Sequence, residues 1–143
     1  MKIIFDYNRT IFDPDIDALY PGVLDLLSTL SQKNKLFLIS RNEPARKDRM
    51  KELGIEKYFQ KVAFVAEKSP REFQEMAGDG KNVLVVGDSI TDEIKIGNRL
   101  GFITVRLKKG KFAMETPMQQ DEIAIHDIFD ILDLEKVIST YEK

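Results

Sequence analysis

Short apolar runs recur along the chain and alternate with segments whose apolar residues have helical spacing. Such a run is typical of a strand that is buried on both faces of a parallel sheet. We therefore expect strands at residues 2–6, 35–40, 62–65, 82–87 and 102–106, and helices at residues 21–32, 43–53, 69–77 and 90–100. The rest predicts a loop at 7–19, a turn at 78–80, an irregular stretch at 107–121, a short edge strand at 123–125 and helical segments ending near Tyr141.

The first predicted helix, at residues 21–32, illustrates the sequence signals that indicate a helix. Pro21 suits a first helical turn, and Val23, Leu26, Leu27 and Leu30 fall on one face at helical spacing. Strands that alternate with such helices predict a parallel sheet with right-handed crossovers. The pattern therefore indicates an α/β fold, a doubly wound three-layer sandwich around a mainly parallel sheet.

Polar side chains that can do chemistry follow several of these strands. Asp6 ends the first strand, Ser40 ends the second, Lys68 follows the third, and Asp88 and Asp92 follow the fourth. Taken singly, each has an ordinary explanation, such as a helix cap or a solvated first-turn acid. In open α/β sheets, however, ligands bind outside the carboxyl ends of the strands, so these groups meet at one edge. A carboxylate, a hydroxyl, a cation and an acidic pair suit phosphoryl transfer through an aspartyl-phosphate with Mg²⁺.

These residues also belong to four short sequence motifs that occur in a fixed order along the chain. Residues 6–10 resemble Asp-x-Asp-x-Thr, Ser40 closes the next strand, residues 68–73 keep a Lys followed by Pro and an acid-Phe pair, and residues 87–92 read Gly-Asp-Ser-x-x-Asp. The chain thus resembles a haloacid dehalogenase-like (HAD) hydrolase over nearly its whole length. A HAD-like, Rossmann-type domain is the fold that this resemblance implies.

The resemblance also implies roles for the first motif and the acidic pair. Asp6 would attack phosphorus and become the acyl-phosphate. Mg²⁺ would be held by Asp6, the backbone carbonyl of Asn8 and Asp88, while Asp92 would bind the ion directly or orient a water beside it. Thr10 would brace the loop rather than touch the substrate.

The remaining roles concern the phosphoryl group. Ser40 and the backbone amide of Arg41 would hold its oxygens, and Lys68 would neutralise both Asp6 and a phosphoryl oxygen. A lysine at a helix start is disfavoured by the helix dipole, which favours a specific anionic partner for Lys68.

Three features depart from the family pattern. The second Asp of the first motif, which serves as acid and base in phosphatases of this type, is Asn8, which cannot carry a proton. The usual Gly before Thr10 is Arg9, which implies a different loop course or an extra cation near phosphate. An engineered trap would explain Asn8 but not Arg9, which favours natural divergence. About thirty residues separate Thr10 from Ser40, too few for a cap domain, so we expect an open site closed by a second copy of the chain or a large substrate.

Composition narrows the function classes. The 143 residues support one domain, 1–143, with 43% apolar and 32% charged residues and a net charge of −2. This balance argues against nucleic-acid and membrane partners. The resemblance implies a phosphorylated substrate, small or macromolecular. The chain has no Cys and one His, which argues against disulfides and a zinc site. With no signal peptide in view, we expect a cytoplasmic protein.

The leading hypothesis is a Mg²⁺-dependent phosphatase, slowed by Asn8. The first alternative is a phosphate- or phosphoprotein-binding module without turnover. A phospho-receiver domain is disfavoured because the third strand leads only to Ala66 and Glu67, and a dehalogenase needs no Mg²⁺ cluster. Residues 108–111 and His126 carry no functional argument and are expected to be solvated.

Overall fold

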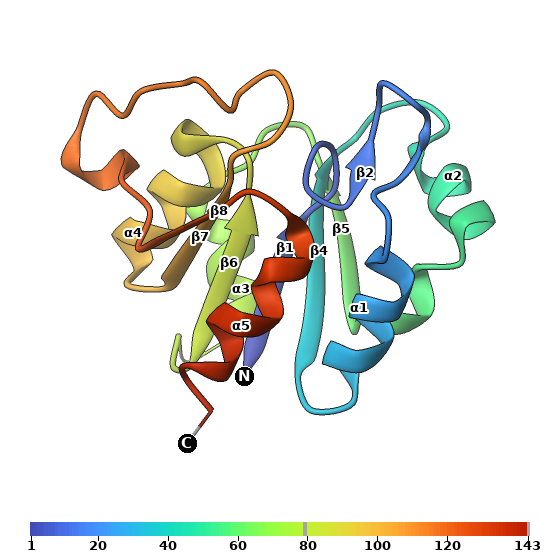
Figure 1. Cartoon of the computed structure of the whole chain (residues 1–143), viewed down its shortest axis with the longest axis horizontal. Helices are drawn as coiled ribbons and strands as arrows, with labels where there is room; N and C mark the ends of the chain where they lie inside the picture. Colours follow the sequence, from blue (N-terminus) through green and yellow to red (C-terminus); the bar gives the residue numbers. More distant parts are fainter. Residues whose placement is uncertain (79, 143) are drawn as a thin grey trace.

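One six-stranded sheet forms the centre of the computed structural model, which describes residues 1–78 and 80–142 (Figure 1). Its strand order is β5-β4-β1-β6-β7-β8, and every neighbouring pair is parallel. The strands are β1 (Lys2–Asp6), β4 (Lys35–Arg41), β5 (Lys61–Val65), β6 (Val83–Gly87), β7 (Ile103–Leu107) and β8 (His126–Ile128). All of the carboxyl ends therefore lie along the same edge of the sheet.

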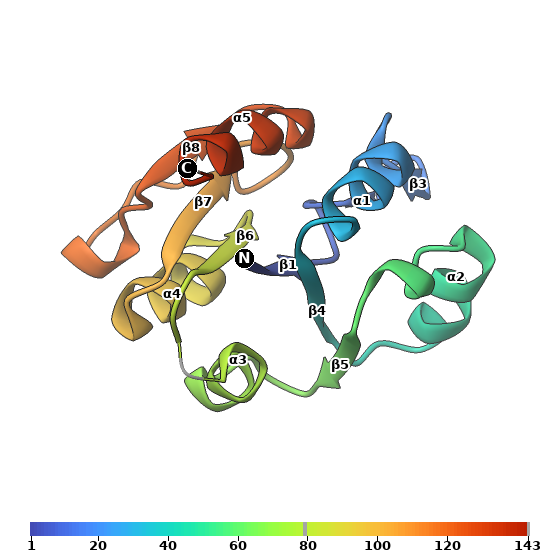
Figure 2. The same ribbon diagram turned by 90° about the horizontal axis from the view of Figure 1, so that it is seen from below.

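Helices cover both faces of the sheet (Figure 2). One face carries α1 (Val23–Ser31), α2 (Arg46–Leu53) and α5 (Leu134–Ser139), and the other carries α3 (Pro70–Ala77) and α4 (Lys95–Leu100). Side chains alternate between the faces along each strand, so Ile3 and Phe5 join one apolar core while Ile4 joins the other. The predicted three-layer α/β sandwich is confirmed.

The expected loop at 7–19 contains a small hairpin, β2 (Phe12–Asp13) with β3 (Ala18–Leu19). Its strands have two residues each, too few for an alternating pattern to be seen. The rings of Tyr7 and Phe12 stack at 4.9 Å and anchor the hairpin on the core.

The expected strand at 123–125 is wrong: the edge strand is β8, which pairs with β7 in the register Val105↔His126. Ile123 and Ile125, which suggested the earlier position, are 49% and 58% exposed. Ile128 is buried instead, so contact with the core rather than local apolar pattern decided the position.

Helix starts also differ from expectation. α2 begins three residues later than predicted, because the backbone NH of Asn42 bonds to the carbonyl of Val65 and Ala45 is left-handed (φ 65°). The helix expected at 90–100 opens with a π-helical turn, η2 (Ile90–Ile94), before α4. In the described part of the chain, three short 3₁₀ turns complete the elements: η1 (Glu56–Tyr58), η3 (Gln120–Glu122) and η4 (Ile131–Asp133).

The turn expected at 78–80 includes Asp79, which lies outside the described residues. Within the described ranges, no helix is both long and apolar enough to cross a membrane.

Candidate active site

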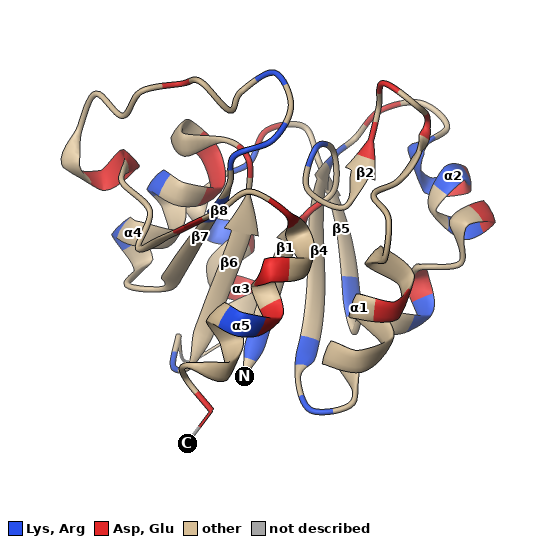
Figure 3. Cartoon of the chain, viewed as in Figure 1, with Lys and Arg blue, Asp and Glu red and all other residues tan. Residues whose placement is uncertain are grey.

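The predicted site residues meet at the carboxyl edge of the sheet, where segments of both charge signs converge (Figure 3). Asp6 ends β1, Ser40 lies near the end of β4, and Asp88 directly follows β6. These three strands are neighbours, with β1 in the middle. A cavity of about 380 Å³ opens there, and Asp6, Asp88 and Lys68 are among the residues that line it. The apolar strands thus deliver polar groups from distant parts of the sequence to one place.

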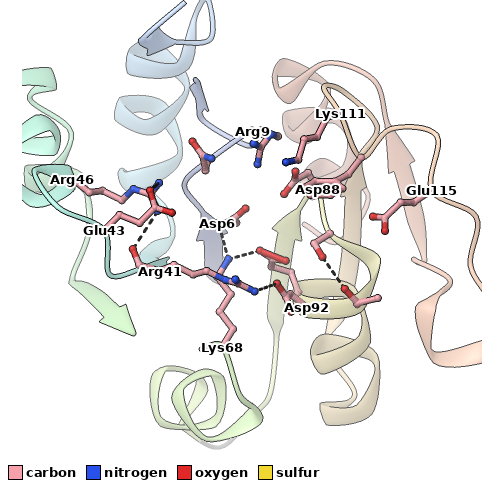
Figure 4. Close-up of a pocket in the computed structure, with 15 residues that line it drawn as sticks. Asp6, Arg9, Arg41, Glu43, Arg46, Lys68, Asp88, Asp92, Lys111 and Glu115 are labelled. Atoms are coloured by element: carbon pink, nitrogen blue, oxygen red, sulfur yellow. Dashed lines mark hydrogen bonds and ion pairs between the residues drawn. The ribbon is translucent and has the colours of Figure 1, made fainter. Parts of the chain in front are cut away.

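Lys68 connects two carboxylates at the base of this cavity. Its Nζ donates to Asp6 Oδ1 and to Glu93 Oε1, both at 2.5 Å (Figure 4). Only 5% of the Lys68 side chain is exposed, so this is a buried ion triad rather than a surface salt bridge. The other oxygen of Asp6, Oδ2, accepts a 3.3 Å hydrogen bond from the Thr10 hydroxyl. Thr10 was expected to brace the loop, and this bond also orients the Asp6 carboxylate.

Asp6, Asp88 and Glu93 form an acidic cluster suited to a hard divalent cation. One carboxylate oxygen from each lies within 4.8 Å of the others. In the described part of the chain, Asp88 Oδ2 and Glu93 Oε2 are buried and have no hydrogen-bond partner. Three ionised carboxylates and one ammonium would leave an excess of two negative charges, which a divalent cation offsets. Oxygen donors with this charge fit Mg²⁺.

The pKa values of the charged residues in the cluster are shifted in different directions. Burial opposes ionisation of Asp6, but the Lys68 ammonium outweighs it and holds the pKa of Asp6 below its usual value. Burial, reinforced by the neighbouring Asp6, raises the pKa of Asp88 to about 8. The same two causes raise the pKa of Glu93 well above its usual value, although Lys68 opposes them. The pKa of Lys68 is itself raised, because Glu93 and Asp6 outweigh the effect of its burial.

Ser40 lies on β4, on the other side of β1 from Asp88. Its side chain is held by Arg46, a residue that the sequence analysis missed. Its hydroxyl accepts a 3.0 Å hydrogen bond from Arg46 Nη1 and donates to the carbonyl of Arg41 at 3.0 Å. The Arg46 guanidinium also lies 5.3 Å from the centre of the Tyr7 ring. Ser40 does not cap the following helix, because the residue at that position is Ala45. The only sequence signal for Arg46 was its place in a charged helix after the Ser40 strand.

Glu93, which the sequence analysis missed, belongs to the acidic cluster in which Asp92 was expected. Asp92 lines the cavity but pairs with Arg41 at 3.3 Å, whereas Glu93 points to Lys68. Gly87 makes this possible, because a Cβ there would lie 2.6 Å from Glu93 Cγ. The glycine before Asp88 was therefore a sequence signal that another side chain, here Glu93, packs directly against the backbone at that position.

Asn8 and Arg9 both line the cavity. The backbone of Asn8 forms a bridge with Phe12, which fixes its position beside the hairpin. Arg9 has φ 61°, so it keeps a left-handed conformation that suits Gly, and its guanidinium lies 5.2 Å from the centre of the Phe112 ring. Of the two expectations for Arg9, the structure supports an additional cation at the site.

The long irregular stretch takes part in the cavity. Lys111, Phe112 and Glu115 line it. Lys111 is solvent-exposed, as expected for residues 108–111, and also borders the cavity. Lys108 instead lies over the ring of Phe129. His126, expected at the surface, is partly exposed and its ring nitrogen pairs with the Tyr141 hydroxyl.

Comparisons with known proteins agree with this fold and identify the family. The sequence model of a family described as haloacid dehalogenase-like hydrolase matches residues 2–101. The chain is 27% identical over 120 residues to a glyceraldehyde 3-phosphate phosphatase from Methanopyrus kandleri, covering 76% of the chain but 52% of that relative. The chain thus spans about half the length of this curated relative.

Solved structures show the same fold at low sequence identity. A protein from Burkholderia xenovorans described as haloacid dehalogenase-like has a TM-score of 0.84 at 12% identity, with 99% of this chain and 98% of that one covered. An uncharacterized protein from Listeria monocytogenes has a TM-score of 0.78 at 15% identity, with the same coverage. A HAD-hydrolase from Bacillus subtilis, solved with bound magnesium, has a TM-score of 0.67 at 21% identity, covering 85% of this chain and 56% of that one.

Proposed function

Because the chain belongs to the haloacid dehalogenase-like hydrolase family, we propose that it is a Mg²⁺-dependent phosphatase that forms an aspartyl-phosphate on Asp6. The observation that carries the proposal is the setting of Asp6. Its two carboxylate oxygens are held by Lys68 and Thr10 at the edge of an open cavity, and its pKa is lowered, so it is ionised and oriented. An ionised carboxylate in such a position can act as a nucleophile.

In this proposal the residues around Asp6 prepare the attack on phosphorus. The Asp6 carboxylate forms the new oxygen–phosphorus bond as the bond to the leaving oxygen breaks. Lys68 offsets the charge of Asp6 and of the incoming phosphoryl group, and the backbone amide of Arg41 would hold a phosphoryl oxygen. The Ser40 hydroxyl, which does not line the cavity, would hold a second one after exchanging its bond to the Arg41 carbonyl for a bond to phosphate. Such preorganised donors stabilise charge that develops in a transition state.

Within the acidic cluster, Asp6 and Asp88 would hold Mg²⁺ together with the backbone carbonyl of Asn8, and Asp92, outside the cluster, is a further candidate ligand. When bound, the ion would neutralise charge on the phosphoryl group and on the attacking carboxylate. Glu93, through its bond to Lys68, would keep the ammonium directed at Asp6.

Asn8 limits this chemistry. The amide can donate a hydrogen bond to the leaving oxygen but cannot protonate it, and it cannot take a proton from the water that clears the aspartyl-phosphate. We therefore expect slow turnover. Among substrates, turnover should be fastest for those whose leaving group needs no proton. The substrate is a phosphorylated compound, and a second copy of the chain or a large substrate would close the open cavity.

Asn8 also favours a second candidate, a phosphate-binding module without turnover. The two functions are separated by hydrolysis of p-nitrophenyl phosphate with Mg²⁺ and after its removal. We expect Mg²⁺-dependent hydrolysis that is lost in Asp6→Asn and kept in Asp127→Asn, where the exposed Asp127 lies on β8 away from the cavity lining. Hydrolysis that persists in Asp6→Asn would refute the nucleophile. Saturable phosphate binding without any hydrolysis would establish the binding module instead.

A further inference from the structure

Arg9 and Lys111 form a pair of cations on the Asp88 side of the cavity (Figure 4). The two residues are about a hundred positions apart in the sequence, but both lie over one ring: the Arg9 guanidinium is 5.2 Å and the Lys111 ammonium 5.0 Å from the centre of Phe112. Phe112 therefore holds two like charges at the same part of the cavity edge.

These two cations differ from the other basic residues of the cavity. Lys68 pairs with Asp6 and Glu93, and Arg41 pairs with Asp92. Arg46 likewise pairs with a carboxylate, that of Glu43. Within the described residues, neither Arg9 nor Lys111 has a carboxylate oxygen within 4.0 Å. Their charge is available to a ligand.

The arrangement has a free-energy cost. Arg9 holds φ 61°, a left-handed conformation that costs a non-Gly residue about 1–2 kcal/mol. Bringing a second cation to the same ring adds repulsion. A bound anion would offset both costs.

The position of Lys111 is set by the fold rather than by a free loop. Arg106, on β7 and 3% exposed, donates from Nη2 to the carbonyl oxygens of Phe112, Ala113 and Glu115 at 3.2, 3.4 and 2.7 Å. This buried guanidinium ties the loop that carries Lys111 and Phe112 to the sheet. The loop segment next to Lys111 is therefore preorganised, which lowers the cost of binding a ligand.

We propose that Arg9 and Lys111 are a second anion site, which selects phosphate esters that carry another negatively charged group, a carboxylate or a second phosphate. This inference rests on the proposed function, since the phosphoryl group to be transferred would lie at Asp6. The second group would lie on the Arg9 side of the same cavity. A guanidinium and an ammonium recognise both carboxylates and phosphates.

Three inert probes test the site in the presence of Mg²⁺: propylphosphonate, phosphonopropionate, which has a terminal carboxylate, and the bisphosphonate with the same three-carbon chain. Binding is measured by titration calorimetry at matched ionic strength. The parent should bind a doubly anionic probe about tenfold or more tightly than propylphosphonate, because hydrogen bonds to charged groups are worth at least that factor. Comparing the carboxylate with the second phosphonate identifies which group the site prefers.

The variants are Arg9→Gly, which removes the guanidinium without backbone strain, and Lys111→Ala. Both should bring the affinity ratio towards one. Lys108→Ala removes the same charge from the same loop but outside the cavity lining, and should keep the ratio. Equal affinities for single and double anions in the parent would overturn the second site while the phosphate site stands. If no phosphonate binds at all, the proposed function fails and this inference fails with it.

Discussion

Replacing Asn8 by Asp restores a group that can carry a proton at the point where the reaction lacks one. Asn8 lines the cavity with Asp6, and its backbone is fixed by its bridge to Phe12 and by the 2.7 Å bond from the Arg9 amide to the Phe12 carbonyl. The substitution therefore exchanges an amide nitrogen for an oxygen without moving the chain. A positioned acid or base contributes about 10²–10⁴-fold, or about 3–5 kcal/mol, to each half-reaction.

Steady-state hydrolysis of one aryl and one alkyl phosphate measures this effect. In the parent, the aryl ester should release its first product in a burst, because the attack needs little proton transfer while the aspartyl-phosphate clears slowly. The alkyl ester should be slow from the start. Asn8→Asp should abolish the burst and raise steady-state turnover by about 10²–10⁴-fold.

Asn42→Asp is the matched control, since it makes the same exchange at an exposed position next to Arg41 that does not line the cavity. It should leave both rates unchanged. Equal turnover by the parent and Asn8→Asp would refute the assigned role of position 8. Equal gains in Asn8→Asp and Asn42→Asp would show a general effect of charge instead.

Three further predictions concern the cluster and the loop. Mg²⁺ at a hundredfold excess over its Kd should stabilise the parent by about 2.7 kcal/mol in a thermal melt; Asp88→Asn should lose most of this shift and Asp127→Asn should keep it. A parent melt insensitive to millimolar Mg²⁺ would argue against the metal site. Gly87→Ala should cost about 1–3 kcal/mol in urea unfolding and lower activity, because its Cβ would meet Glu93 Cγ at 2.6 Å; unchanged stability would contradict this packing. Arg9→Gly should be about 1 kcal/mol more stable than Arg9→Ala, since both lack the guanidinium and only Ala is strained at φ 61°; the reverse order would show that the loop relaxes.

The sheet and most of the helices were predictable from sequence because they depend on local periodicity. Buried parallel strands must be apolar on both faces, and this constraint is readable in β1, β4 and β6 without knowing their neighbours. The hairpin at 12–19 and the position of β8 were not predictable, because two- and three-residue strands have too few positions for a pattern. Their position depends on partners elsewhere in the chain.

Some features of the site were likewise predictable from the sequence and others were not. The meeting of Asp6, Ser40, Lys68 and Asp88 was predictable from their places in the sequence, since strand ends in a parallel sheet share one edge. The contact of Glu93 with Lys68 was not predictable, because it depends on a π-helical turn and on the space above a glycine. The tertiary structure likewise brought Arg9 and Lys111 to one ring. Their proximity comes from Arg106 holding a distant loop, an interaction between segments that no local pattern records.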